Sequence, residues 1–265
     1  MLEHCLERGV TTVDLADVYG AYTAERRFGD ALALAPGLRD QLQLVSKCGI
    51  LFPCPEKPSA RIKHYDYTAK NLIASVERSL NKLGTDRLDL LLLHRPSPLL
   101  NPIEVAEAFS RLQQQGKVLH FGVSNFTPAQ FEALQANIDQ PLVTNQIECS
   151  LLATTPMFDG TFDQCLAKAI SPMIWSPLGG GALFTSTKST ATRVRTALED
   201  LSVKYKCNSA QLAYAWLLRH PSRPHVVLGT THQHRLEEAI ASTRIELELQ
   251  DWFLLLEASQ GKEVP

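Results

Sequence analysis

The stretch RLDLLLLHRP, residues 87–96, decides the fold class of this chain. Its leucine run is too short for a typical helix and is bounded by Pro96, a pattern typical of a strand buried on both faces. Such strands occur in parallel sheets that are covered by helices. The run also ends on a titratable ring, His94. The stretch therefore predicts an α/β fold and raises the question of what the histidine does.

Six further segments show the same pattern, a short apolar run followed by helix signals. They are VTTVDL (10–15), LQLVSK (42–47), VLHFGVS (118–124), LVTNQIE (142–148), PMIWS (172–176) and HVVLGT (225–230). Helix boundaries are marked as well. Asn101 and Thr127 each stand before a proline, as N-cap residues often do, and residues 68–84 carry an apolar stripe at helical spacing. The chain thus predicts seven βα units.

Two observations favour a closed (β/α)8 barrel over an open doubly wound sheet. No GxGxxG follows any predicted strand, so the dinucleotide fingerprint of the open fold is missing. Polar residues also stand at or just past the carboxyl end of each predicted strand, where the active sites of barrels are built. These residues are Asp14, Lys47, His94, Ser124, Asn125, Gln146, Ser176 and Thr230. We therefore expect residues 1–265 to form a single barrel domain.

The composition is that of a soluble globular protein. Of the 265 residues, 45% are hydrophobic and 20% charged, and the net charge is −2. The lack of a basic stripe argues against nucleic acid as a partner. No apolar stretch is long enough to cross a membrane and the amino terminus lacks a signal-peptide pattern, so we expect a cytoplasmic protein with no membrane partner. The six cysteines have no CxxC or zinc spacing, so we expect them to be reduced and mostly buried.

Four of the polar residues together suit proton delivery to a carbonyl oxygen. A tyrosine is a poor acid at neutral pH, but a nearby cation lowers its pKa, and Lys47 is the available cation for Tyr19. A lysine drawn into a barrel mouth needs a counter-charge, for which Asp14 is the candidate. His94 can donate a second hydrogen bond to the substrate oxygen. We therefore expect Asp14, Tyr19, Lys47 and His94 to be catalytic.

Six motifs, in order, resemble those of the aldo-keto reductase superfamily. They are TTVDLADVYG, LVSK, DLLLLHRP, GKVLHFGVSNF, NQIE and WSPLGGG, and the match runs from about residue 10 to about residue 245. The chain looks especially like the bacterial branch of probable oxidoreductases whose substrates are unassigned. The resemblance implies a (β/α)8 barrel that uses NADP(H), or less often NAD(H), to interconvert aldehydes or ketones and alcohols without a metal. The implied partner is a small carbonyl or alcohol substrate.

The resemblance also implies a role for each matching residue. Tyr19 matches the general acid, Lys47 its pKa-lowering partner, Asp14 the counter-charge and His94 the substrate-orienting donor. The implied cofactor-binding residues are Ser124, Asn125, Gln146, Trp175, Ser176, Leu178, Gly229, Thr231, Arg235 and Glu238. Among them Trp175 matches the aromatic residue that stacks on the nicotinamide. Arg235 matches the position for the 2′-phosphate, which favours NADP over NAD.

The chain departs from the family pattern at its start. Family members begin with a hairpin and a first barrel strand, whereas MLEHCLERG, residues 1–9, is typical of the end of the first helix. We therefore expect a barrel that lacks its first strand. Three explanations are open: an omitted ordered segment, a misassigned start, or a truncated chain that compensates by association. The unpaired strand edges of an open barrel favour the first two. A smaller departure is Ala239, where the family usually has an asparagine that contacts adenine.

Two other functions compete with a reductase. One is a regulatory protein that binds the nicotinamide cofactor with little turnover, against which the intact catalytic set argues. The other is a metal-dependent barrel hydrolase. Its site would need several His, Asp or Glu ligands, but the strand ends supply one histidine and one carboxylate beside a lysine.

Overall fold

A computed structural model describes residues 1–35 and 37–264 of the chain. They fall into two compact units. The amino-terminal unit comprises residues 2–145, and the carboxyl-terminal unit runs from Gln146 onwards and includes Met1. Each unit is described by itself.

The amino-terminal unit contains a parallel sheet whose strands follow the predicted runs. The order is β1 (Thr12–Asp14), β2 (Gln43–Cys48), β5 (Leu88–Leu93) and β6 (Val118–Ser124), and β7 (Leu142–Glu148) begins in this unit. The leucine run of β5 is buried as expected, with Leu91, Leu92 and Leu93 each at most 1% exposed. Three consecutive buried residues require that both faces of the strand are covered, because successive side chains point to opposite faces. The prediction of an α/β fold with buried parallel strands is confirmed.

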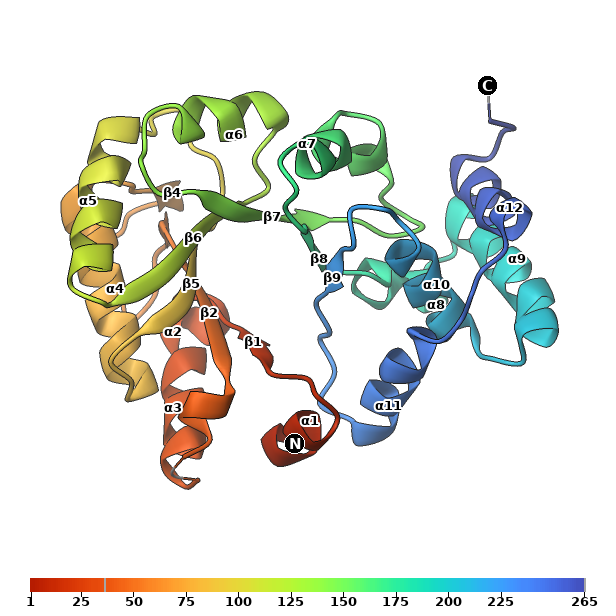
Figure 1. The fold of residues 1–265 in the computed structure, drawn as a ribbon, viewed down its shortest axis with the longest axis horizontal. Helices are drawn as coiled ribbons and strands as arrows, with labels where there is room; N and C mark the ends of the chain where they lie inside the picture. Colours follow the sequence, from red (N-terminus) through yellow and green to blue (C-terminus); the bar gives the residue numbers. More distant parts are fainter. Residues whose placement is uncertain (36, 265) are drawn as a thin grey trace. The chain divides into compact units, whose positions relative to one another are not determined.

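Helices cover these strands. They are α1 (Leu2–Glu7), α2 (Tyr19–Tyr22), α3 (Ala24–Ala33), α4 (Ala69–Leu83), α5 (Pro102–Gln114) and α6 (Pro128–Gln135), with a 3-10 turn η1 at Arg39–Gln41. In Figure 1, α4 and α5 lie alongside β5 and β6. The contacts show that α3 packs on α4, which packs on α5 and β2, while α5 also packs on β6.

The predicted helix boundaries are confirmed by their caps. The Thr68 hydroxyl accepts a hydrogen bond from Asn71 N at 3.3 Å, and α4 ends at Gly84 in the left-handed conformation. Asn101 caps α5, and Thr127 forms a capping box with Gln130 in α6. These side chains satisfy backbone donors that the first turn leaves without partners.

The segment between β2 and α4 holds a small antiparallel pair that the sequence pattern did not predict. Strand β3 (Ile50–Leu51) pairs with β4 (His64–Tyr65), and Asp66 N donates to Gly49 O at 3.0 Å just outside the pair. Two residues per strand are too few to carry an alternating pattern. The pairing of β3 with β4 is therefore seen only in the tertiary structure.

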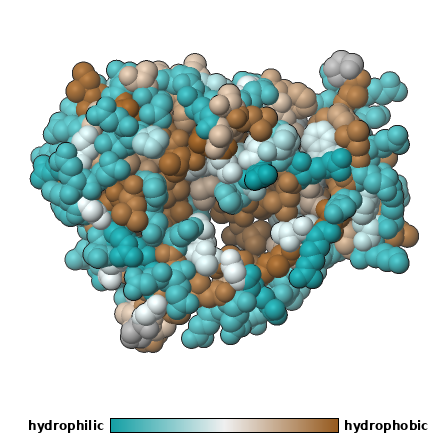
Figure 2. Space-filling model, viewed as in Figure 1, coloured by the Kyte–Doolittle hydropathy of each residue, from teal (hydrophilic) through white to brown (hydrophobic). Residues whose placement is uncertain are grey.

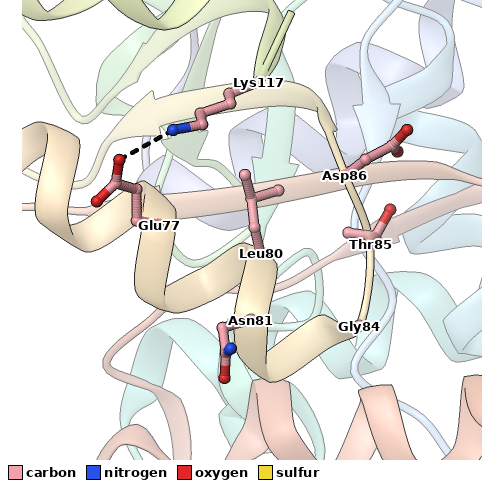
Figure 3. Close-up of a pocket in the computed structure, with 7 residues that line it drawn as sticks. All are labelled: Glu77, Leu80, Asn81, Gly84, Thr85, Asp86 and Lys117. Atoms are coloured by element: carbon pink, nitrogen blue, oxygen red, sulfur yellow. Dashed lines mark hydrogen bonds and ion pairs between the residues drawn. The ribbon is translucent and has the colours of Figure 1, made fainter. Parts of the chain in front are cut away.

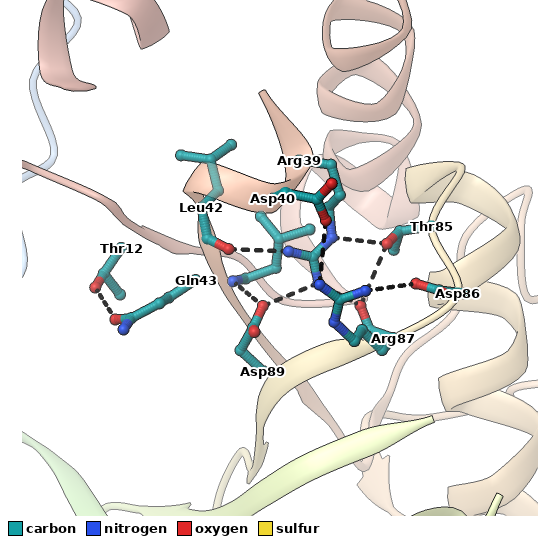
Figure 4. Close-up of polar contacts among 10 residues, drawn as sticks. Thr12, Arg39, Asp40, Leu42, Gln43, Thr85, Asp86, Arg87 and Asp89 are labelled. Carbon is teal, nitrogen blue, oxygen red and sulfur yellow. Dashed lines mark hydrogen bonds and ion pairs between the residues drawn. The ribbon is translucent and has the colours of Figure 1, made fainter. Parts of the chain in front are cut away.

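The amino ends of the strands are tied by charge contacts, as Figure 4 shows. Arg39 donates through Nη2 to Asp89 Oδ2 and to Arg87 O, each at 2.9 Å, and through Nε to Thr85 Oγ1 at 2.7 Å. Asp89 also accepts from Leu44 N at 2.8 Å. This network links β2 to β5 at the edge opposite the predicted catalytic residues.

A surface pocket lies at the same edge (Figure 3). It is lined by Glu77, Leu80, Asn81, Gly84, Thr85, Asp86 and Lys117. The Glu77–Lys117 ion pair, at 2.9 Å, crosses it. Residues at the amino ends of barrel strands usually serve stability, so this pocket is not the candidate active site.

The carboxyl-terminal unit holds the rest of β7 and two shorter parallel strands, β8 (Met173–Trp175) and β9 (His225–Val226). Its helices are α7 (Thr161–Ala167), α8 (Ala182–Thr185), α9 (Ser189–Tyr205), α10 (Ser209–Leu218), α11 (Gln233–Ser242) and α12 (Leu249–Gln260), with 3-10 turns η2 (Thr155–Met157) and η3 (Gly179–Gly181). The core of the unit includes Trp216, whose indole stacks on Trp252. Each indole N–H donates to the other residue's carbonyl, at 3.0 and 2.9 Å.

All seven predicted strands are therefore present. An eighth strand in the parallel sheet is not found within residues 1–35 and 37–264. The six cysteines are free thiols, as expected, but only Cys48, Cys149 and Cys165 are buried, so the expectation of mostly buried cysteines holds for half of them. Burial raises the pKa of the Cys48 thiol well above its usual range, which disfavours the reactive thiolate.

Hydrophilic residues cover much of the face seen in Figure 2. Within the part of the chain that the structure describes, no helix combines the length and apolar character needed to span a bilayer.

Candidate active site

Lys47 is the centre of a polar cluster in the amino-terminal unit. Its ammonium donates to Asp14 Oδ2 at 2.7 Å, to Leu15 O at 2.7 Å and to Tyr19 Oη at 3.1 Å. Asp14 ends β1, Lys47 lies near the end of the neighbouring strand β2, and His94 directly follows β5. We call Asp14, Tyr19, Lys47 and His94 the polar tetrad. The structure brings all four together, at the carboxyl ends of adjacent strands.

The Lys47 charge is stabilised inside the protein by its partners. The side chain is fully buried, and that of Asp14 is 12% exposed. A buried ammonium without a counter-charge would be strongly unfavourable, but here a carboxylate and two further oxygen atoms surround it. Nζ also lies 4.8 Å from the centroid of the Tyr19 ring. Lys47 is therefore held rigidly with one donor aimed at the tyrosine oxygen.

A sharp turn aims the Tyr19 hydroxyl. Gly20, Ala21 and Tyr22 all have positive φ values, 58°, 52° and 69°. For the last two this left-handed conformation is strained, and strain of this kind is tolerated where the surroundings hold it. The Tyr22 side chain holds the turn in place, because its buried hydroxyl donates to Ile50 O at 2.9 Å. Tyr19 itself is 38% exposed, so its hydroxyl is accessible to a substrate.

His94 is neutral at physiological pH. Burial, and then the charges of Lys47, Arg95 and Lys63, lower its pKa to about 3. A neutral ring carries one N–H donor, which can donate a hydrogen bond to a carbonyl oxygen. The ring packs edge-on to Tyr19, with centroids 5.7 Å apart. His94 can therefore orient an oxygen that lies within reach of the Tyr19 hydroxyl.

A buried pair of carboxyl groups lies close to the tetrad, and the sequence analysis missed it. Asp17 N donates to Lys47 O, and its side chain is buried, with Oδ1 lacking a hydrogen-bond partner among the described residues. Glu25 accepts from Ser46 Oγ at 2.7 Å. Burial, and then the charge of Glu25, raise the pKa of Asp17 to about 7. Asp17 stands within DLADVYG, but nothing in that motif marks it as buried.

Ser124 and Asn125 lie in the same unit as the tetrad, where β6 ends. Asn125 has a positive φ of 61°, and its amide donates to Ser124 Oγ at 2.7 Å. The two side chains thus form one hydrogen-bonded pair at the carboxyl end of a strand. They can offer an amide and a hydroxyl to a carboxamide group.

The other eight predicted cofactor residues belong to the carboxyl-terminal unit. Gln146 is buried in β7 and its amide contacts Met173 Sδ at 3.8 Å. Trp175 ends β8, and Ser176, with φ 51°, starts the turn into Leu178 and the glycines of η3. A Cβ placed on Gly181 or on Gly229 would meet no atom within 4 Å.

The remaining residues lie at or near the start of α11. Thr231 and Arg235 are exposed there, and the N-cap His232 makes no capping hydrogen bond through its side chain. An exposed arginine on the first turn of a helix suits a phosphate. Glu238 has a different environment: its carboxylate accepts from Asn208 Nδ2 at 2.6 Å and so ties α11 to the start of α10.

The tetrad can deliver a proton to an oxygen atom. Tyr19 is the accessible donor, and the Lys47 ammonium stabilises the phenolate that remains. In residues 1–35 and 37–264, no three His, Cys, Asp or Glu side chains are grouped so that they could hold a metal ion.

Comparison with known proteins gives a consistent result. The model of the Aldo/keto reductase family matches residues 1–259. An uncharacterized oxidoreductase, YcsN of Bacillus subtilis, is 46% identical over 100% of this chain and 89% of its own length. A 6-dehydroglucose reductase of Agrobacterium fabrum is 46% identical over 99% and 88%, and the oxidoreductase YdhF of Escherichia coli is 45% identical over 100% and 88%.

Solved structures of two aldo-keto reductases share the fold. The thermostable enzyme Tm1743, in complex with the inhibitor epalrestat, matches with a TM-score of 0.79 at 26% identity, over 97% of this chain and 85% of that one. An enzyme from Klebsiella pneumoniae, in complex with NADP and acetate, matches with a TM-score of 0.76 at 24% identity, over 99% and 83%.

Proposed function

The chain belongs to the aldo/keto reductase family, and we propose that it interconverts aldehydes or ketones and alcohols by NADP(H)-dependent hydride transfer. Family membership makes it an oxidoreductase of small carbonyl compounds. The single observation that carries the proposal is the contact of Lys47 Nζ with both Asp14 and Tyr19. We further propose that the fold is a (β/α)8 barrel of the family's type, of which the described residues hold seven parallel strands, and that the chain forms one catalytic domain.

Each member of the tetrad has a task in this reaction. Tyr19 gives its hydroxyl proton to the carbonyl oxygen as negative charge develops there. Lys47 stabilises the resulting phenolate, and Asp14 keeps the ammonium in place. His94 donates its ring N–H to the same oxygen and so orients the carbonyl. When bound, the reduced nicotinamide supplies the hydride to the carbonyl carbon.

The residues present fit a nicotinamide dinucleotide. Ser124 and Asn125 of the amino-terminal unit would offer a hydroxyl and an amide to the carboxamide. Gln146 and Trp175 of the carboxyl-terminal unit would offer a further amide and an aromatic face. Ser176 and Leu178 precede the η3 glycines, where we propose that the pyrophosphate binds. Gly229, Thr231, Arg235 and Glu238 would hold the adenosine end, with the exposed Arg235 cation for a 2′-phosphate. That cation is our reason to prefer NADP(H), although NAD(H) is also accommodated by the other groups.

Substitution of Tyr19 by phenylalanine tests the proposal. We expect turnover of NADPH with aldehydes or ketones to fall by roughly 10²- to 10⁴-fold, because the proton donor is lost. NADPH affinity should stay within about twofold, because the hydroxyl serves the chemical step rather than ground-state binding. The measurement is the loss of NADPH absorbance with a panel of carbonyl compounds. The panel should include 6-dehydroglucose, which the name of the Agrobacterium relative specifies.

The matched control is Tyr205→Phe. It removes a hydroxyl that accepts from Glu248 N in the carboxyl-terminal unit. Turnover should be unchanged in this variant. If Tyr19→Phe also kept full activity, Tyr19 would not be the proton donor.

The alternative remains a regulatory protein that binds the cofactor. It predicts tight NADPH binding by the wild-type chain together with negligible turnover across the whole panel. The intact tetrad favours the enzyme, because a binding protein has no need of a buried Lys47 aimed at a phenol.

A further inference from the structure

Tyr67 lies between β4 and α4 and contacts the backbone beside His94. Its ring is 5% exposed. The hydroxyl donates to Arg95 O at 2.5 Å and accepts from Arg95 N at 3.0 Å. Arg95 directly follows His94. The Tyr67 hydroxyl is therefore hydrogen-bonded to both the backbone C=O and the backbone N–H of the residue next to His94.

Gly49 makes room for this contact. Its φ is +109°, and a Cβ at this position would lie 2.1 Å from Tyr67 Cε1 and 2.5 Å from Cζ. The ring therefore rests against the glycine backbone, in a place that any other residue would block. The preceding carbonyl, Cys48 O, accepts from His94 N at 3.0 Å. Cys48 on one side and Tyr67 on the other thus hold the backbone of His94 and Arg95.

The His94 ring depends on this backbone support. Its Nδ1 is buried and has no hydrogen-bond partner among the residues that the structure describes. Functional histidines are usually oriented by a hydrogen bond to the second ring nitrogen. Without that bond, the direction of the ring follows from the position of its backbone and from its packing against Tyr19.

The Tyr67 hydroxyl keeps its proton through the working pH range. Burial raises the pKa of Tyr67 well above its ordinary value. The group therefore keeps the proton that lets it donate and accept at once at neutral pH.

We propose that Tyr67 is a positioning residue that fixes His94 through the backbone of Arg95, and so sets how the substrate carbonyl is oriented. This inference rests on the proposed function. Both hydrogen bonds to Arg95 and the close approach of the Tyr67 ring to Gly49 are present in the structure.

The first test is Tyr67→Phe, which keeps the ring against Gly49 and removes only the hydroxyl. The Arg95 backbone N–H and C=O each lose their hydrogen bond to the Tyr67 hydroxyl. The catalytic efficiency with the carbonyl substrate should therefore fall about tenfold. NADPH affinity should be unchanged. Tyr205→Phe loses a comparable hydroxyl, one that also accepts from a backbone N–H and donates to Asp251, and should keep full efficiency.

A double-mutant cycle separates positioning from general loosening of the fold. If Tyr67 acts through His94, Tyr67→Phe should cost nothing further in a His94→Ala background. The same tenfold loss in that background would overturn the proposal, because the hydroxyl would then act without the histidine.

A spectroscopic test does not need turnover. The His94 ring resonance, assigned by its absence in His94→Ala, should titrate at a very low pH in the wild-type chain and at a pH nearer 6.5 in Tyr67→Phe, where the ring is less well held in its buried position. An identical resonance and titration in both proteins would overturn the inference even if the wild type proved inactive. A shifted titration in an inactive chain would sustain the inference while the proposed reduction failed.

Discussion

Lys47 and Asp17 are two buried titratable residues in different surroundings, although Asp17 N donates to Lys47 O at 3.0 Å. The Lys47 ammonium is surrounded by oxygen atoms of Asp14, Leu15 and Tyr19 that accept its hydrogen bonds. Asp17 lacks a partner on Oδ1, and its neighbours are mixed: Glu25 repels its charge, whereas Lys57, Arg78 and Lys82 attract it. The carboxyl group is therefore kept protonated up to a pKa of about 7.

This raised pKa predicts that stability falls as pH rises. The carboxyl of an unfolded chain releases its proton near the ordinary value of 3.8, whereas folded Asp17 holds it to about 7. Between these values the folded state binds the extra proton, so the Asp17 contribution lowers the free energy of unfolding by up to about 1.4 kcal/mol per pH unit. Above about 7 the contribution is constant.

The Asp17→Asn variant has no titratable group at this position, so its free energy of unfolding should depend less on pH. We expect the variant to unfold at a higher temperature than the wild type at pH 8 and to approach it at pH 5, as measured by thermal unfolding across that range. Asp30→Asn, at an exposed position on α3, should follow the wild-type curve. Equal slopes for Asp17→Asn and the wild type would mean that Asp17 is ionised in the folded protein.

The contact between α3 and α4 depends on a single glycine. Gly29 is buried in the middle of α3, and a Cβ there would lie 2.2 Å from Lys82 O and 2.9 Å from Leu83 Cα. Backbone atoms of a helix cannot yield as a flexible side chain would. The close approach of the two helices therefore requires a residue without a side chain.

Gly29→Ala should destabilise the protein in spite of alanine's better helix propensity. Overpacking of this kind costs about 1–3 kcal/mol, more than the roughly 1 kcal/mol that the substitution gains in a helix interior. The midpoint of urea unfolding measures the balance. Asp30→Ala, at the neighbouring exposed position, should hold or raise the midpoint, since it removes a negative charge near the carboxyl end of the helix. A raised midpoint for Gly29→Ala would disprove the tight contact.

The proposed catalytic and cofactor-binding residues are divided between the two units of the chain. The tetrad, Ser124 and Asn125 belong to residues 2–145, and the other cofactor residues follow Asn145. Cofactor binding should therefore be visible as stabilisation of the folded chain against heat. A ligand at a hundredfold excess over its dissociation constant adds about 2.7 kcal/mol.

We expect NADPH to raise the unfolding temperature more than NADH does, because Arg235 is placed for a 2′-phosphate. Arg235→Ala should remove most of that difference, and Arg244→Ala, an exposed arginine just beyond α11, should preserve it. Quenching of tryptophan fluorescence on titration gives an independent reading, which Trp175→Phe should abolish. Equal stabilisation by both cofactors in the wild type would remove the basis for preferring NADP(H).

Much of the fold could be predicted from local sequence patterns. The seven strands, the caps at Thr68, Asn101 and Thr127, and the ordering of Asp14, Lys47 and His94 at strand ends all follow from periodicity and capping chemistry, which act over a few residues. Parallel strands bring their carboxyl ends to one edge, so an ordered series of polar residues already predicted that the tetrad would meet.

Other features came only from tertiary structure. Some of these features join residues 13 to 50 positions apart, namely the β3–β4 pair, the Arg39 network and the Tyr67 clamp on Arg95. The burial of Asp17 with Glu25 depends on what covers them. Glu238, which the sequence predicts to bind the cofactor, accepts a hydrogen bond from Asn208 Nδ2. Burial and partnership are properties of the packed chain. A residue's type and spacing determine which strand or helix it joins, whereas its charge state and its hydrogen bonds are set by the elements that pack against it.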